Sequence, residues 1–522
     1  MLYSNPVKEK LKKGVPAFFA MLRFSNPMIA QIIAKSGVDS ICIDNEHYPF
    51  TDEQIINIVR AVHDVGVECT IRPSLKNTNY IYRLLDMGVD GLLFPNVETA
   101  EEAKGIIAAC KYPPLGNRGC CPITAGAEYG INVDVQEYYK KKNDAVSIGI
   151  MIESKAGIEN IEDILKLDGI DYFAVGPSDM SGSFGRPGRA GDPDIKAEID
   201  ALHNTIIAAG IPVESLGYST EQAVKDFNEG KKVFNIGSDL QMLTKRFKFH
   251  VESVRNAIAK YSNLNSQLTL KEKFEKKQPI INCFVRIPEP AIAEIAGLSG
   301  ADMVTLDNEH FPYTDKDLYN SIIATHLAGK KAIVRIYDKS PAYIGRLLDM
   351  GADGILAPQV KSAEEVEQII QSVKYAPRGM RGYCPISIAA DYGIGHTVEG
   401  YSEEANNQTI IGVMIETKEA IEDLDRILAL DGLDYISVGP SDLSASYGYP
   451  GLYDVKVVSD AVAYANKAAI ESKVSVSAQC YNQESAENAL SKGVNVINIG
   501  SDLQFLLWGF GEHISNLKKA FC

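Results

Sequence analysis

The sequence has few of the features that would place a chain in a membrane or on nucleic acid. Its 522 residues carry 52 Lys and Arg against 68 Asp and Glu, a net charge of −16. This shortage of basic residues argues against nucleic acid or an anionic membrane as a main partner. The opening stretch MLYSNPVKEKLKKGV holds no apolar segment typical of a secretory signal. No apolar run approaches the roughly 18 residues of a membrane helix.

Cysteine is scarce and irregularly placed. The nine cysteines are scattered, and only Cys121 and Cys384 occupy equivalent positions in the internal repeat described next. A disulfide framework would recur in both copies of a repeat, so the sequence predicts free thiols and a cytoplasmic location. The remaining composition, 45% hydrophobic and 23% charged, is typical of ordinary globular domains.

The chain contains one long internal repeat. The segment ICIDNEHYPF at 41–50 returns as VTLDNEHFPY at 304–313, 263 residues later. The same separation joins Arg72 to Arg335, Glu153 to Glu416, and Asp179 to Asp442. A repeat of this length far exceeds the roughly 20–50 residues of a solenoid unit, so each copy should be a whole domain. We therefore expect a tandem duplication with domains at 1–262 and 263–522.

Each copy alternates short β-rich apolar runs with amphipathic stretches. The expected strands of the first copy lie near 16–22, 39–44, 67–72, 90–94, 148–153, 171–176, 211–215 and 233–237, and those of the second near 280–285, 303–307, 331–335, 353–357, 410–416, 434–439, 473–478 and 495–500. Eight strands with helical crossovers in about 250 residues predict an α/β fold of two tandem (β/α)8 barrels. A long connection at 111–147, repeated at 374–409, exceeds what a plain crossover needs and suggests a functional loop.

The repeated polar residues of the first copy fall at the ends of predicted strands. His47 follows the second strand, Arg72 ends the third, Glu153 ends the fifth and Asp179 follows the sixth. They should therefore meet at the carboxyl-terminal mouth of the barrel, where barrel enzymes keep their chemistry. A carboxylate that ends an apolar run such as IGIMIES is costly to bury unless it is paired or binds a metal.

These residue types together indicate a particular chemistry. Two carboxylates from neighbouring strands, with no cysteine and no HxxxH pattern nearby, favour Mg2+ or Mn2+ over a closed zinc site. An arginine beside them would neutralise an enolate oxygen, and a histidine would move a proton. The combination suits polarisation of a carbonyl that lies next to a carboxylate.

Several motifs resemble a known enzyme family. IDNEHYPF, IRPS, LLDMG, GxRG, IESKAGIENIEDIL and VGPSDMSGSFGRPG are similar to the motifs of the HpcH/HpaI metal-dependent (class II) pyruvate aldolases, in the same order and over nearly all of each half. The resemblance implies barrels of the phosphoenolpyruvate/pyruvate-domain type. It also implies an aldehyde-lyase that cleaves a 4-hydroxy-2-oxo acid to pyruvate and an aldehyde through a metal-bound enolate, using Mg2+, Mn2+ or Co2+.

The resemblance also assigns roles to individual residues. It implies that the metal is held by Glu153, Asp179, Glu416 and Asp442. It implies that the enolate is stabilised by Arg72 and Arg335, and that the aldol hydroxyl is served through water by His47 with Asp86 and by His310 with Asp349. Backbone amides in the turns that contain Ser178 and Ser441 would bind the pyruvate carboxylate.

The sequence departs from the family pattern on the acceptor side of the site. Methionines Met151 and Met414 replace a common glutamine, and arginines Arg23 and Arg286 follow the first strand of each copy, where small or polar residues are usual. Each arginine either pairs with a protein carboxylate, such as Glu46 or Glu309, or binds an anionic group of the substrate. We include Arg23 and Arg286 among the expected substrate-binding residues.

Three other interpretations stay open at this point. A Schiff-base aldolase would use Lys155 or Lys418, which recur just beyond the fifth strand of each copy. A related synthase or lyase of the citrate-forming kind would join the enolate to a second 2-oxo acid. A catalytically inactive scaffold would be expected to lose charged mouth residues in at least one copy, and neither copy has lost them.

Family members are usually assemblies, so we expect an intrachain pseudo-dimer of the two halves and further homo-oligomers.

Overall fold

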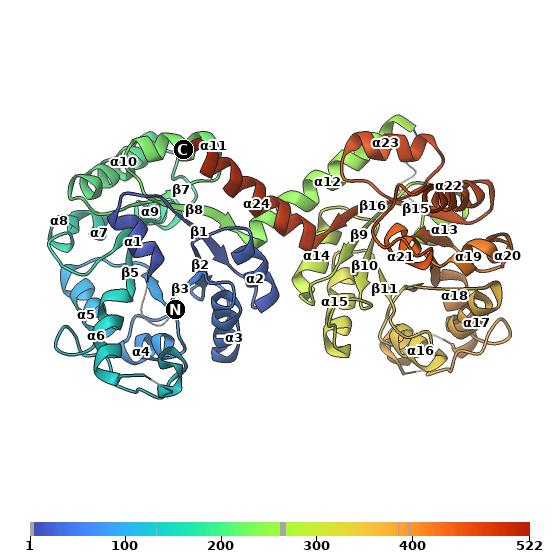
Figure 1. The fold of residues 1–522 in the computed structure, drawn as a ribbon, viewed down its shortest axis with the longest axis horizontal. Helices are drawn as coiled ribbons and strands as arrows, with labels where there is room; N and C mark the ends of the chain where they lie inside the picture. Colours follow the sequence, from blue (N-terminus) through green and yellow to red (C-terminus); the bar gives the residue numbers. More distant parts are fainter. Residues whose placement is uncertain (1–4, 132, 262–267, 385, 395–396, 522) are drawn as a thin grey trace. The chain divides into compact units, whose positions relative to one another are not determined.

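The computed structural model describes residues 5–131, 133–261, 268–384, 386–394 and 397–521 (Figure 1). The described chain divides into two compact units. One contains the residues up to Met242 together with those from Leu506 onward, and the other is Leu243–Phe505. The expected domain boundary, between residues 262 and 263, lies outside the described residues.

The first unit is built on a sheet of eight parallel strands. Its strands are β1 (Ala17–Leu22), β2 (Ser40–Asp44), β3 (Glu68–Arg72), β4 (Gly91–Phe94), β5 (Ser147–Ile152), β6 (Tyr172–Val175), β7 (Glu214–Leu216) and β8 (Val233–Ser238). Neighbours follow the order β6-β5-β4-β3-β2-β1-β8-β7. A parallel bridge between Phe173 and Val213 links β6 to the residue before β7 and so connects the two ends of the sheet.

The second unit is a closed barrel of eight parallel strands. Its strands are β9 (Ile280–Val285), β10 (Met303–Asp307), β11 (Lys331–Arg335), β12 (Gly354–Ala357), β13 (Ile410–Ile415), β14 (Tyr435–Val438), β15 (Ser475–Gln479) and β16 (Val496–Ser501). The predicted fold class, two tandem (β/α)8 barrels, is confirmed. The strand positions expected from the sequence agree closely, except that β7 begins at Glu214.

Helices fill the connections between successive strands (Figure 1). Those of the first repeat are α1 (Pro6–Lys12), α2 (Pro27–Lys35), α3 (Asp52–His63), α4 (Thr78–Asp86), α5 (Ala100–Cys110), η1 (Ala125–Gly130), α6 (Val135–Ala145), α7 (Lys155–Glu159), α8 (Ile161–Ile164), α9 (Pro177–Ser183), α10 (Pro193–Ala208), α11 (Thr220–Asn228) and α12 (Asp239–Tyr261). Those of the second are α13 (Leu270–Glu275), α14 (Pro290–Leu298), α15 (Asp315–Leu327), α16 (Pro341–Asp349), α17 (Ala363–Val373), η2 (Ile388–Gly393), α18 (Val398–Gln408), α19 (Lys418–Glu422), α20 (Leu424–Ala429), α21 (Pro440–Ser446), α22 (Lys456–Glu471), α23 (Gln483–Ser491) and α24 (Asp502–Phe521).

Local sequence signals explain where many of these helices begin. Thr51 caps α3 and Thr314 caps α15, each in a capping box with the residue three positions later. The side chain satisfies a backbone N–H that has no partner inside the helix, which stabilises a helix start by about 1 kcal/mol. Proline occupies the first turn of α2 and α14, where its missing N–H is not needed.

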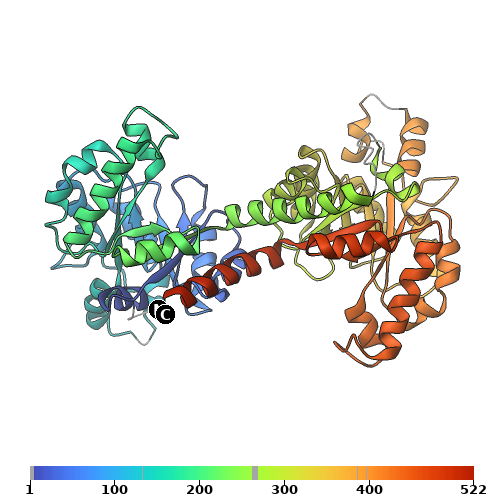
Figure 2. The same cartoon turned by 90° about the horizontal axis from the view of Figure 1, so that it is seen from above.

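The last helix of each repeat crosses the boundary between the compact units. Within the first unit, Lys518 of α24 donates to the carbonyl of Gly37 at 3.0 Å, and the ring of Phe521 stacks 5.9 Å from that of Phe18. Figure 2 shows α24 as the long red helix at the end of the chain. Within the second unit, Arg255 of α12 donates to the carbonyl of Gly300 at 3.0 Å. Each unit therefore includes a helical segment encoded by the other repeat.

Large apolar side chains fill the interior of each barrel. In the first barrel Phe19, Met151 and Tyr172 belong to one buried cluster, and Phe284 and Met414 belong to its counterpart in the second. Burial of each such side chain stabilises the fold by about 1.5–3 kcal/mol. The interior is thus packed, and open chemistry is confined to the strand ends. Within the described residues, no helix is both long and apolar enough to cross a membrane.

Candidate functional site

An arginine and a carboxylate are bound together at the mouth of the first barrel. Asp44 and Arg72 end the neighbouring parallel strands β2 and β3, and the strand register places them side by side. Arg72 donates to Asp44 Oδ1 from Nε at 3.1 Å and from Nη2 at 2.8 Å, and its Nε lies 3.1 Å from Glu46 Oε2. Because Asp44 has no exposed surface, this pair fixes the guanidinium in one orientation.

The second barrel repeats this arrangement. Arg335 donates from Nε to Asp307 Oδ1 at 2.8 Å and from Nη2 to Oδ2 at 2.5 Å. Its Nη1 lies 3.2 Å from Glu309 Oε2 and 3.7 Å from the sulfur of Met414. The methionine that departs from the family pattern is therefore in direct contact with the mouth arginine.

In the first barrel, Glu153 lies at the carboxyl end of β5, where it is buried near Arg72. Its Oε1 accepts the backbone N–H of Asn96 at 2.7 Å, and Asn96 has a left-handed φ of 49°. Burial, together with a smaller effect of the nearby carboxylates Glu46 and Asp179, raises the pKa of Glu153 to about 7. A Cβ at Gly176 would overlap Glu153 Oε2, so only glycine leaves room for the carboxylate at that turn.

Glu416 has the same surroundings in the second barrel. The backbone N–H of Gln359, with a left-handed φ of 50°, donates to Glu416 Oε1 at 2.7 Å. Burial raises the pKa of Glu416 to about 7, with further contributions from Glu309 and Asp442. A Cβ at Gly439 would overlap Glu416 Oε2.

The second expected metal ligand of each barrel lies on a short helix after the sixth strand. Asp179 is exposed on α9 and Asp442 is exposed on α21, and each influences the pKa of its neighbouring glutamate. Within the described residues, no group of three or more His, Cys, Asp or Glu could enclose a metal. Two oxygen donors with an excess of negative charge fit a hard divalent cation that keeps several water ligands.

The two expected catalytic histidines are exposed at the rim of their barrels. The side chain of His47 is 53% exposed, and its Nε2 lies 3.7 Å from Glu46 Oε2. His310 is 51% exposed, and its Nε2 lies 3.5 Å from Glu309 Oε2. Each histidine follows the second strand of its barrel, and about half of its side chain is exposed to solvent.

The aspartates expected to partner these histidines lie elsewhere. Asp86 is the last residue of α4, and its Oδ1 accepts a hydrogen bond from Arg118 Nη2 at 2.8 Å. Asp349 accepts one from Arg381 at 2.7 Å at the end of α16. A helix that follows a barrel strand runs back toward the amino end of the next strand. The expected pairings of His47 with Asp86 and of His310 with Asp349 are therefore not found within either barrel.

Arg23 and Arg286 each lie beside a protein carboxylate, although not beside Glu46 and Glu309, the examples that the sequence suggested. Arg23 Nε lies 3.5 Å from Asp44 Oδ2 rather than against Glu46, and its guanidinium lies 5.4 Å from the centre of the Tyr48 ring. Arg286 Nε lies 3.4 Å from Asp307 Oδ2 and its guanidinium 5.7 Å from the centre of the Phe311 ring. Asp44 and Asp307 are the nearer carboxylates because each lies on the strand next to the arginine. The side chains of Glu46 and Glu309 instead contact Arg72 and Arg335.

Ser178 and Ser441 lie in the first turns of α9 and α21, where free backbone N–H groups point out of the helix start. The side chains of both residues are exposed.

The ammonium of Lys155 lies 4.5 Å from the centre of the Phe184 ring, and Lys418 pairs with Glu422 one turn along its own helix. Neither lysine is buried in the mouth, so the structure does not favour a Schiff base.

Sequence reasoning missed two sets of residues that shape the site. Asp44 and Asp307 stand inside the repeated DNEH motif but were given no role. Asp239 and Asp502 also recur, and each accepts backbone N–H groups of the arginine segment, from Arg23 at 3.0 Å and from Arg286 at 3.0 Å. Burial raises the pKa of both Asp239 and Asp502 to about 6. Their recurrence at strand ends was the signal that could have identified them.

Known relatives match about half of this chain, a length close to that of one repeat. A 2-keto-3-deoxy-L-rhamnonate aldolase from Salmonella typhimurium (strain LT2) is 32% identical over 274 residues, which cover 52% of this chain and 99% of the relative. A protein of the same name from Salmonella paratyphi A (strain ATCC 9150) matches over the same 274 residues at 32% identity.

Solved structures that resemble parts of the chain include the HpcH/HpaI aldolase from Desulfitobacterium hafniense DCB-2. It is 27% identical with a TM-score of 0.45, over 48% of this chain and 97% of that one. A citrate synthase, SbnG, is 23% identical with a TM-score of 0.45, over 49% of this chain and 98% of that one.

The sequence profile of one family matches each repeat separately, at residues 18–245 and 281–507. The matched segments contain the second to eighth strands of both barrels and every expected site residue of the mouth. The chain therefore belongs to the HpcH/HpaI aldolase/citrate lyase family.

Proposed function

We propose that the protein is a divalent-metal-dependent carbon–carbon lyase that cleaves a 4-hydroxy-2-oxo acid to pyruvate and an aldehyde. One observation carries the proposal. Both barrels hold, at the same strand ends, a fixed arginine beside a glutamate whose pKa is raised by burial and, to a smaller extent, by nearby carboxylates. The similarity to aldolases that act on a 2-keto-3-deoxy sugar acid supports the same class of substrate here.

We propose that a divalent cation, Mg2+, Mn2+ or Co2+, is held by Glu153 and Asp179 in one barrel and by Glu416 and Asp442 in the other. Burial and, to a smaller extent, nearby carboxylates raise the pKa of each glutamate, and a bound cation would stabilise the ionised carboxylates. When bound, such a cation supplies Lewis-acid polarisation of the 2-oxo group. The backbone N–H groups around Ser178 and Ser441 would bind the substrate carboxylate.

Arg72 and Arg335 would stabilise the charge that develops as the carbon–carbon bond breaks. The Nε and Nη2 atoms of Arg72 are occupied by Asp44, and its Nη1 has no hydrogen bond among the described residues. Nη1 is therefore the atom that remains to face an enolate oxygen. A donor held in place before the reaction stabilises that charge without reorganising.

His47 and His310 would move the proton of the substrate hydroxyl. In the cleavage direction the C4 hydroxyl loses its proton, the C3–C4 bond breaks and the aldehyde leaves. The electron pair passes to the enolate of pyruvate, which then takes up a proton at C3. Rim exposure suits His47 to exchange this proton through water.

The test is exchange of the methyl protons of pyruvate with deuterium from solvent, followed by NMR, with Mg2+, Mn2+ or Co2+ added. We expect exchange that EDTA stops, and aldehyde release from members of a panel of 4-hydroxy-2-oxo acids. Exchange that persists after rigorous metal removal, or the absence of both exchange and cleavage with every metal, would contradict the proposal. Borohydride trapping with pyruvate tests the Schiff-base alternative through Lys155 or Lys418.

A second candidate function is condensation of the enolate with another 2-oxo acid, as in a citrate-forming synthase. Arg23 favours it, because a cation that is 23% exposed beside Tyr48 suits an acceptor with its own carboxylate. Incubation with pyruvate and oxaloacetate, followed by mass spectrometry, distinguishes condensation from cleavage by the formation of a longer tricarboxylate.

We also propose that the repeats 1–262 and 263–522 act as an intrachain counterpart of a dimer, in the cytoplasm, with further assembly into homo-oligomers. The support is that each compact unit includes a helical segment from the other repeat. Light scattering at several concentrations would report the mass of the assembly.

A further inference from the structure

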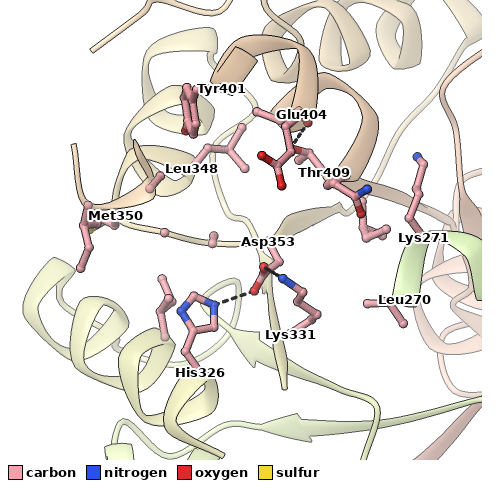
Figure 3. A pocket seen from close by; sticks show the side chains of 18 of the residues that line it. Leu270, Lys271, His326, Lys331, Leu348, Met350, Asp353, Tyr401, Glu404 and Thr409 are labelled. Carbon is pink, nitrogen blue, oxygen red and sulfur yellow. Dashed lines mark hydrogen bonds and ion pairs between the residues drawn. The ribbon is translucent and has the colours of Figure 1, made fainter. Parts of the chain in front are cut away.

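A cavity of about 580 Å3 lies at the end of the second barrel opposite its mouth (Figure 3). Its walls come from the beginnings of β11, β12 and β13, and from α15, η2 and α18. Cavities that bind small molecules typically measure about 300–1,000 Å3. This one is therefore large enough for a ligand, and it is separate from the site proposed for catalysis.

One wall of the cavity carries a group of three polar side chains, His326, Lys331 and Asp353. His326 Nε2 lies 2.7 Å from Asp353 Oδ2, and Lys331 Nζ donates to Asp353 Oδ1 at 2.8 Å. The side chain of Lys331 is 54% exposed and that of His326 is 40% exposed. Both bases therefore keep surface available on the cavity side while Asp353 holds them in position. Lys271 also lines the cavity, but its Nζ forms an ion pair with Asp434 Oδ1 at 2.7 Å.

The opposite wall carries a carboxylate and apolar groups. Glu404 of α18 is exposed, has no ion pair among the described residues, and directs its carboxylate into the cavity (Figure 3). Apolar side chains separate it from the charged wall, namely Ile322, Leu348, Met350, Ile388 and Ile410. The cavity thus has a basic side, an acidic side and an apolar surface between them.

The corresponding region of the first barrel is smaller because a lysine side chain occupies part of it. An equivalent cavity of about 240 Å3 is lined by His63, Met87 and Gly88, the counterparts of His326, Met350 and Gly351. Lys142 extends into it, with Nζ 4.0 Å from Asp90 Oδ1 and a side chain that is 10% exposed. The counterpart of Lys142 is Ala405, which leaves this volume open in the second barrel.

A buried polar network in the first barrel has no counterpart in the second. Asn5 donates to Ser147 Oγ at 2.7 Å, and Ser147 donates to Glu68 Oε1 at 2.9 Å. The counterparts of these three buried residues are Leu268, Ile410 and Lys331. The second repeat has thus lost the internal network and gained an exposed lysine, a free carboxylate and more volume at one place.

We propose that this cavity of the second barrel binds a small zwitterion with an apolar body, of the amino-acid class. Its carboxylate would lie beside Lys331 and His326, its ammonium beside Glu404, and its apolar group against Leu348 and Ile388. A simple anion would face Glu404, and a simple cation would face the two bases. Only a ligand that carries both charges satisfies both walls.

Isothermal titration calorimetry of the full chain with leucine tests the proposal. Two probes share its skeleton: 4-methylpentanoate lacks the ammonium and 3-methylbutan-1-amine lacks the carboxylate. We expect leucine to bind at one site per chain and each truncated probe to bind at least roughly tenfold more weakly. Glu404→Gln should weaken leucine while leaving 4-methylpentanoate unchanged or tighter.

The matched variant is Ala405→Lys, which gives the second barrel the residue that already occupies this position in the first. It should abolish leucine binding without lowering the unfolding temperature, whereas Lys142→Ala should leave leucine binding to the second barrel unchanged. The absence of leucine binding, equal binding of 4-methylpentanoate, or full binding by a folded Ala405→Lys variant would each overturn the proposal. Because binding is measured directly, none of these outcomes depends on the aldolase activity.

Discussion

Arg72 donates two hydrogen bonds to a single oxygen of Asp44, from Nε at 3.1 Å and from Nη2 at 2.8 Å. The two residues face each other across the parallel strands β2 and β3, so the backbone ladder itself sets their separation. The second barrel has the same pair in Arg335 and Asp307. The orientation of the mouth arginine is therefore a property of the barrel framework and is in place before any substrate binds.

Removal of the Asp44 carboxylate should strongly destabilise the first barrel. In Asp44→Ala the guanidinium of Arg72 stays buried without its main partner, a situation that typically costs about 3–5 kcal/mol. We expect a loss of this size in the free energy of unfolding, measured by urea denaturation. Asp163→Ala serves as the control, because it breaks the exposed pair with Lys166 and should cost less than about 1 kcal/mol. Equal losses for both variants would contradict this account of Asp44.

Loss of the metal ligands in one barrel should remove about half of the activity, if the two sites work independently. Glu153→Ala with Asp179→Ala leaves Glu416 and Asp442 intact. We expect roughly half of the wild-type rate of pyruvate proton exchange per chain. The same pair of changes made in both barrels should abolish exchange. Complete loss from the first pair alone, with the fold preserved by circular dichroism, would mean that the second site is silent or strictly coupled.

Replacement of both acceptor-side arginines should separate enolate formation from acceptor recognition. Arg23→Leu with Arg286→Leu should spare pyruvate proton exchange and lower turnover of an acidic acceptor by roughly 10- to 100-fold, because a bidentate contact to its carboxylate is lost. Neutral aldehydes should be affected far less. Steady-state kinetics with a matched pair of acidic and neutral acceptors provides the measurement. Equal losses for the two acceptors would show that the arginines only brace Asp44 and Asp307.

The pH dependence of stability should reveal the buried Glu68. Burial, together with a smaller effect of the nearby Asp90, raises the pKa of Glu68 from about 4.5 to about 8. The folded state therefore holds this proton more tightly than the unfolded state. Its contribution to stability is fully present below about pH 4.5 and is lost as the pH rises through about 8.

Glu68→Gln cannot ionise, so it isolates this contribution. The free energy of unfolding of the wild type, relative to that of Glu68→Gln, should fall steadily between about pH 5 and 8 and then level off. Urea denaturation of both proteins at several pH values gives the difference curve. A flat difference, or one that rises with pH, would contradict the prediction. The second barrel offers no equivalent carboxylate, because Lys331 occupies that position.

The sequence predicted most of the fold because its repeat and its periodicity report local structure. The separation of 263 residues exposed the duplication, and β-rich runs between capped helices located the strands. The same strand ends identified the buried Glu153 and the mouth arginine Arg72, because the register of a parallel barrel brings the carboxyl ends of all strands to one face.

Contacts between elements that are distant in sequence could not be predicted from the repeat or from the periodicity. Residue type alone does not say which of two nearby carboxylates an arginine meets, and strand pairing gave Arg23 to Asp44 rather than to Glu46. Helix direction placed Asp86 against Arg118 and away from His47.

A duplicated barrel with an acidic, arginine-bearing mouth in each half could be predicted from the amino-acid sequence alone. The spacing of apolar residues and the polar residues at strand ends lie within single segments of the chain. They can therefore be recognised without knowing how the helices pack. The folded structure shows which buried charges pair, and it shows that the space filled by Lys142 in one barrel is open beside Ala405 in the other. Such differences depend on how side chains pack across several elements at once, and no single stretch of sequence contains that information.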